Sequence, residues 1–147
     1  MTYASPPGLV LGFHGCATDT YNAVLKDSAP LAPSTNSYDW LGSGIYFWEN
    51  SFSRAIDWAT ARHPDNPAVI GAVIDPGHCL NLTDFQNSGY IRDAYDALAR
   101  AVSKTDLPMP TNRNIRDNTD WLLRDLDCAV VNQVHKMNEE LGDPWRR

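Results

Sequence analysis

The sequence predicts an α+β fold in which a small sheet comes first and amphipathic helices follow. Three short apolar runs, at residues 9–13, 44–48 and 68–74, have the length and the flanking turn residues of strands. After residue 82 the apolar residues recur at helical spacing, over residues 89–102 and 121–141. With 147 residues, of which 43% are hydrophobic, the chain is long enough for one ordinary core, so we expect a single domain over residues 1–147.

Residues 9–13 are the first predicted strand. Two prolines and a glycine precede them, and a polar stretch at residues 17–20 follows. We expect Asp19 or Thr20 to cap the next helix, because short polar side chains accept hydrogen bonds from the first amides of a helix. That helix has apolar residues at helical spacing and ends before Pro30.

A loop at residues 32–43 leads to the second predicted strand, residues 44–48. The loop is rich in Pro, Ser, Asn and Gly, a composition typical of segments that line or cover a site. Residues 49–51 offer caps for a helix over residues 52–61, and the two prolines within residues 63–67 end that helix.

Residues 68–74 are the clearest strand in the chain. They are apolar almost throughout, so we expect this strand to be buried on both faces at the centre of the sheet. The two amphipathic helices that follow are joined by a loop at residues 107–118, which is rich in Pro, Asn and Arg.

Charge and cysteine content exclude several classes of function. Lys and Arg total 12 against 18 Asp and Glu, and the net charge of −6 argues against non-specific nucleic-acid binding. Residues 9–13 are too few for a signal core or a membrane span, so we expect no membrane partner. Three distant cysteines without a C-x-x-C pair predict neither disulfides nor a metal site, and they fit a reducing, cytoplasmic location.

His14 and Cys16 lie two residues apart on a strand, so their side chains point to the same face. A histidine beside a cysteine can produce a nucleophilic thiolate, because the imidazolium lowers the pKa of the thiol. The alternatives are a histidine satisfied by a backbone carbonyl and a cysteine that packs as a small hydrophobe. Downstream, Gly42 and Gly44 leave space beside Tyr46, whose ring can stack on a planar heterocycle.

Together, the segments Phe13-His14-Gly15-Cys16 and Gly42-Ser43-Gly44-Ile45-Tyr46-Phe47 resemble the ADP-ribosyltransferase superfamily, in the branch that includes the poly(ADP-ribose) polymerases. In that branch a strand ends in His-Gly-Ser or His-Gly-Thr, and Gly-x-Gly-Ile-Tyr-Phe follows after a helix and a loop. The run from Tyr38 to Glu49 also resembles small bacterial members of the superfamily. The resemblance covers about residues 8–82.

The resemblance implies a split-sheet core and NAD as co-substrate, with no metal. Such enzymes cleave the nicotinamide–ribose bond and transfer ADP-ribose to an acceptor, which is glycosyl transfer through an oxocarbenium-like transition state. By this resemblance His14 hydrogen-bonds a ribose hydroxyl, the Gly15 backbone bonds the carboxamide, and Tyr46 stacks on the nicotinamide. The implied catalytic residues are His14 and Tyr46, and the implied NAD-binding residues are His14, Gly15, Cys16, Gly44 and Tyr46.

Two departures from the family pattern leave three functions open. Cys16 replaces the usual hydroxyl residue, and no later strand offers the glutamate that fixes the 2′-hydroxyl; Glu139 and Glu140 fall in a predicted helix. The chain is then either a transferase domain that lacks the family's C-terminal strands or a noncatalytic module that binds NAD or ADP-ribose. A helical interaction protein, in which the same residues only pack, is the third interpretation. The acceptor is unknown.

Overall fold

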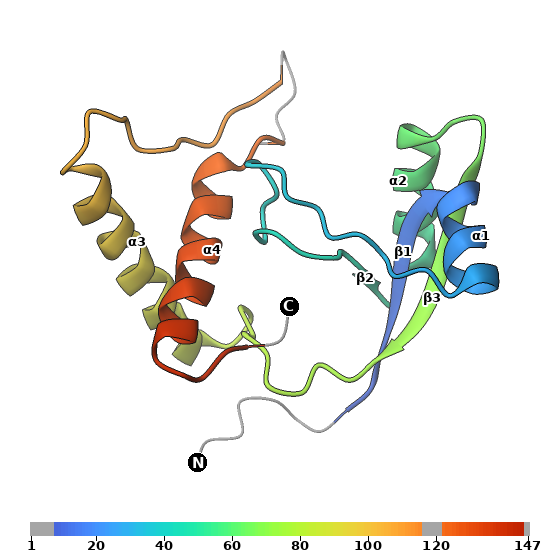
Figure 1. The fold of residues 1–147 in the computed structure, drawn as a ribbon, viewed down its shortest axis with the longest axis horizontal. Coiled ribbons are helices and arrows are strands. Elements are labelled where there is room, and N and C mark those ends of the chain that lie inside the picture. The colour runs from blue at the N-terminus through green and yellow to red at the C-terminus, as the bar shows by residue number, and fades with distance from the viewer. Residues whose placement is uncertain (1–7, 116–121, 146–147) are drawn as a thin grey trace. The chain divides into compact units, whose positions relative to one another are not determined.

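The computed structural model describes residues 8–115 and 122–145, which form two compact units (Figure 1). The sheet unit comprises the described residues of Ser5–Pro33 and Ile45–Gly77, and the helical unit those of Ser34–Gly44 and His78–Arg147. Within the described residues there are a three-stranded antiparallel sheet and four α-helices, so the fold is α+β as predicted. The predictions of one domain and of absent C-terminal strands stay predictions.

The sheet consists of β1 (Val10–Ala17), β2 (Trp48–Glu49) and β3 (Pro67–Ile74), in the order β2-β1-β3. β1 pairs antiparallel with both neighbours. The prediction that residues 68–74 form the central strand is therefore wrong, because β1 takes that place. β3 is also not buried on both faces as expected: Ile70 is 5% exposed, whereas Val73 is 69% exposed.

Helix α2 (Phe52–Arg62) packs on one face of the sheet, and its small residues allow a close approach (Figure 1). Ala55 and Ala59 are fully buried, and the ring of Phe52 meets that of Phe13 on β1 edge to face at 5.8 Å. The helix ends at Arg62 with His63 as its C-cap, one residue beyond the predicted end and directly before Pro64.

Helix α1 (Thr18–Asp27) directly follows β1, so the prediction that Asp19 or Thr20 caps it is wrong. The N-cap is Ala17, which has no capping side chain. Instead, Thr18 joins the start of the helix to the residue that precedes β3: its amide and its hydroxyl both donate to the carbonyl oxygen of Asn66, at 2.8 and 3.0 Å. This contact satisfies an amide at the helix start without a capping side chain.

The helical unit is built on α3 (Ser88–Val102) and α4 (Asp125–Glu140), which pack against each other (Figure 1). A short 3₁₀ turn, η1 (Phe85–Asn87), precedes α3. The core of this unit consists of Ala94, Val130 and Val134 with apolar neighbours on both helices. Helix α4 starts later than the predicted residue 121, and Trp121 itself lies outside the described residues.

Residues 32–43 and the described part of residues 107–118 have no helix or strand, as predicted. Two isolated bridges order them, between Ser34 and Gly44 and between Arg113 and Leu123. Across residues 8–115 and 122–145, no helix combines the length and apolarity that crossing a membrane requires.

Candidate functional site

His14 and the backbone of Tyr46 meet in the sheet unit. Nδ1 of His14 lies 2.8 Å from the carbonyl oxygen of Tyr46, and the His14 ring lies 5.6 Å from that of Phe47. A carbonyl oxygen only accepts hydrogen bonds, so Nδ1 carries the proton in this contact. In the neutral ring Nε2 is then an acceptor, available to a hydroxyl donor.

The backbone of Gly15 points away from β3. In an antiparallel ladder, residues alternate between bonding one neighbour strand and bonding the other. The amide of Thr18 donates to Asn66 on the β3 side, whereas the carbonyl of Leu11 accepts from Asn50 on the β2 side. Even-numbered residues of β1 therefore bond toward β3, and Gly15 directs its N–H and C=O toward the β2 side.

Strand β2 is too short to reach Gly15. Its two pairs with β1 are Gly12 with Glu49 and Phe13 with Trp48. Continued pairing would place Tyr46 opposite Gly15, but the Tyr46 carbonyl faces the His14 ring instead. Among the described residues no strand pairs with Gly15 on this side, so one backbone donor and one acceptor lie side by side next to His14.

Gly15 is also required by the packing of α2. A Cβ at this position would run into the backbone carbonyl of Ala55 and lie 3.2 Å from the Trp58 ring. The missing side chain of Gly15 therefore makes room for helix α2. The ligand role expected of Gly15 belongs to its backbone and stays a prediction.

Cys16 shares the face of His14, as predicted from their spacing, but it is only 4% exposed. Burial raises the pKa of its thiol, and a backbone hydrogen bond at Tyr21 on α1 lowers it to a lesser extent. The thiol therefore stays protonated at neutral pH, which favours a packing role over a nucleophile. Its place among the NAD-binding residues stays a prediction.

Gly44 belongs to the helical unit, whereas His14, Gly15, Cys16 and Tyr46 belong to the sheet unit. Gly44 exchanges two backbone hydrogen bonds with Ser34, at 2.8 and 3.0 Å. A Cβ at Gly44 would meet nothing within 4 Å, so packing in the described residues does not require this glycine. The side chain of Tyr46 is half-buried, and its stacking role stays a prediction.

Gly42 fixes the turn before Gly44. Its φ of +78° is left-handed, and a Cβ there would lie 2.7 Å from Oδ1 of Asn132. The same oxygen accepts a hydrogen bond from the Ser43 amide at 3.0 Å. Sequence reasoning missed Asn132, although an asparagine within an amphipathic helix is a signal for such a contact.

Glu49 is a second residue that sequence reasoning did not place in the site. It pairs with Gly12, and paired residues share a face of the sheet. Phe13 and Trp48 face α2, where Trp48 contacts Trp58 at 5.9 Å, so Glu49 lies on the opposite face with His14. Glu49 is exposed, and it is the one carboxylate within the three described strands.

The other charged side chains of the described chain form neither an ion pair with Glu49 nor a group that could hold a metal ion. Arg54 is exposed and makes no ion pair with Glu49 or Asp57. Glu139 and Glu140 are exposed at the end of α4, outside any strand. Within residues 8–115 and 122–145, no three His, Cys, Asp or Glu side chains are grouped to hold a metal ion.

Comparison of the chain with protein-family models, with curated proteins and with solved structures gives no significant match.

Proposed function

We propose that this protein is an NAD-dependent ADP-ribosyltransferase, which cleaves the nicotinamide–ribose bond and transfers ADP-ribose to an acceptor. The observation that carries the proposal is the backbone of Gly15, which no strand of the described residues pairs on its β2 side, beside the oriented ring of His14. The sequence resemblance of residues 8–82 to the superfamily supports the same activity.

The backbone of Gly15 is complementary to a primary carboxamide. Its N–H can donate to the carboxamide oxygen while its C=O accepts from the carboxamide NH₂, and together these bonds fix the plane of the nicotinamide. Nε2 of His14 accepts from a hydroxyl of the attached ribose. In this proposal the ring of Tyr46 stacks on the nicotinamide, as the resemblance implies.

The chemistry needs orientation more than a strong nucleophile. The bond between ribose C1′ and the nicotinamide nitrogen breaks, its electron pair stays with nicotinamide, and positive charge develops on the ribose. The acceptor then attacks C1′ and loses a proton. Groups that hold the carboxamide and the ribose hydroxyl keep the breaking bond in one geometry, which lowers the entropic part of the barrier.

Glu49 is the carboxylate that best fits the role of the glutamate that fixes the ribose 2′-hydroxyl in the resembling family. Glu49 and His14 are diagonal neighbours across two antiparallel strands, a relation that separates two residues by about 7–8 Å, within reach of long side chains. That spacing leaves room for a ribose whose hydroxyls bond both groups. A carboxylate there also stabilises positive charge on the ribose.

A noncatalytic module that binds NAD or ADP-ribose is the second candidate. It is favoured by the exposure of Glu49, whose carboxylate forms no ion pair within the described residues. Such a module needs the Gly15 edge and His14 but not an oriented carboxylate.

Nicotinamide release from NAD by the purified chain, run beside a calorimetric NAD titration, tests both candidates. We expect release by the unaltered chain, loss of binding in Tyr46→Ala, and at least a tenfold slower release with retained binding in Glu49→Gln. Exposed Asp57→Asn on α2 is the matched control and should change neither. Binding without release would support the module, and absence of binding would contradict both candidates.

A further inference from the structure

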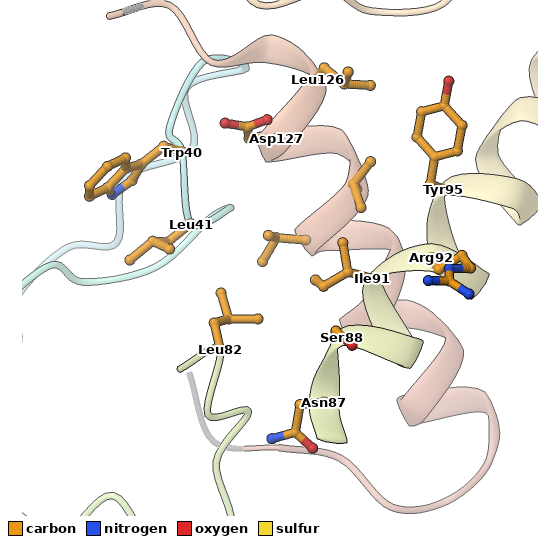
Figure 2. Close-up of a pocket in the computed structure, with 12 residues that line it drawn as sticks. Trp40, Leu41, Leu82, Asn87, Ser88, Ile91, Arg92, Tyr95, Leu126 and Asp127 are labelled. Atoms are coloured by element: carbon orange, nitrogen blue, oxygen red, sulfur yellow. The ribbon is translucent and has the colours of Figure 1, made fainter. Parts of the chain in front are cut away.

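A pocket of about 680 Å³ lies within the helical unit, between α3, α4 and the turn at Trp40 and Leu41 (Figure 2). Its volume is in the range of small-molecule sites. Most of its wall is apolar and comes from three separate segments: Leu41, Leu82, Ile91, Leu126, Val130 and Val131. None of these residues belongs to the sheet unit.

The carboxylate in the pocket wall, that of Asp127, already has partners within the protein. Asp127 accepts a hydrogen bond from the Asn112 amide at 2.7 Å through Oδ1 and pairs with Arg124 at 3.3 Å through Oδ2. The amide group of Asn87, only 9% exposed, donates to the carbonyl of Asn81 at 2.8 Å. These polar groups therefore add little attraction for a cationic ligand.

Arg92 differs from these polar groups because its charge has no partner among the described residues. It lines the pocket from α3, is exposed, and forms no ion pair in the described part of the chain. An apolar cavity with one unpaired cation at its rim is complementary to a molecule that has an apolar body and one negative charge.

The wall formed by Trp40 and Leu41 is held in place before any ligand arrives. The Ser43 amide donates to Asn132 at 3.0 Å, and the Arg124 amide donates to the carbonyl of Tyr38 at 3.2 Å. The Arg124 guanidinium lies 5.9 Å from the Trp40 ring centre, although the ring remains 56% exposed. A wall fixed in this way reduces the ordering cost of binding.

We propose that this pocket binds a small apolar monoanion, with the apolar body between α3 and the Trp40 turn and the anionic group at Arg92. The shared chemistry covers both aromatic sulfonates or carboxylates and aliphatic carboxylates. The proposal does not depend on the transferase activity, because all of its residues lie in the helical unit.

Fluorescence titration with 1-anilinonaphthalene-8-sulfonate tests the pocket. We expect saturable binding of one molecule per chain, and at least a tenfold loss in Leu82→Glu, because the new charge enters the apolar wall that Figure 2 shows at Leu82. Leu107→Glu is the matched control, since Leu107 is 71% exposed in a loop outside the pocket. Equal losses in the two variants, or binding that does not saturate, would overturn the proposal.

Competition experiments test whether Arg92 binds the anionic group, and they distinguish an aliphatic from an aromatic ligand. Octanoate should displace the probe about fivefold better than uncharged octanol, and Arg92→Gln should remove that difference while Arg100→Gln, on the same helix, keeps it. Displacement of the probe by octanoate assigns an aliphatic anion, and saturable probe binding that octanoate does not displace assigns an aromatic one. Octanol that competes as well as octanoate would overturn the role of Arg92.

Discussion

The two nitrogen atoms of His14 have separate tasks. Nδ1 donates to the Tyr46 carbonyl and joins the ends of the two sequence motifs, while Nε2 faces a ligand hydroxyl in the proposed function. His14→Asn keeps a donor at the position of Nδ1 and removes the acceptor. We expect the melting temperature to stay within a few degrees of the original, while NAD binding weakens by about 1–3 kcal/mol. Calorimetric titration and thermal unfolding measure the two effects; unchanged affinity would remove His14 from the site.

Gly15 and Gly44 should respond differently to the same substitution. Gly15→Ala forces a methyl group against the Ala55 carbonyl, so we expect a loss of about 1–3 kcal/mol in the free energy of unfolding. Gly44→Ala meets open space and should change the free energy of unfolding by less than about 0.5 kcal/mol. Urea unfolding of both variants measures this difference.

A strongly destabilised Gly44→Ala variant, or a Gly15→Ala variant as stable as the original chain, would contradict the described surroundings of these two glycines.

Among the elements, the start of α4 depends on an acidic side chain. Asp125 accepts two hydrogen bonds from the Arg113 guanidinium, at 2.9 and 3.1 Å, and one from the Ser37 hydroxyl at 3.1 Å. The hydrogen bonds from Arg113 are the largest cause that lowers the pKa of the Asp125 carboxyl; burial opposes them, and Ser37 adds to the lowering.

A lowered pKa in the folded state makes this contribution dependent on pH. The stabilisation is complete above the ordinary carboxyl pKa of about 4 and is lost as the pH falls through the lower folded-state pKa. We expect Asp125→Asn to be less stable than the original chain at pH 7, with a difference that shrinks below pH of about 4. Urea unfolding against pH measures it, with exposed Asp96→Asn as the control. A difference that grows toward low pH would contradict the direction of the shift.

The helices could be predicted from sequence because their apolar periodicity is local. The start of α1 and the length of β2 could not, because both depend on distant partners. Thr18 uses the Asn66 carbonyl in place of a cap, and β2 stops where the Tyr46 carbonyl turns to the His14 ring. The apolar composition of β3 indicated a strand, but composition does not determine the order of strands in a sheet.

At the scale of the whole molecule, four of the residues expected in one site belong to the same unit. His14, Gly15, Cys16 and Tyr46 all lie in the sheet unit, and their roles in binding NAD stay a prediction. The direction of the Gly15 backbone and the shared face of Glu49 and His14 follow from strand register, which no single motif reveals. The pocket at α3 and α4 likewise depends on three segments that are far apart in the chain.

The most direct test of the central claim is an NMR titration of the chain with nicotinamide, followed at the Gly15 amide proton. We predict a saturable downfield shift of this proton, because its N–H would gain the carboxamide oxygen as an acceptor. Amides of α3 should stay unchanged and serve as the internal control. A Gly15 amide that does not move while nicotinamide binds elsewhere would contradict the proposed site.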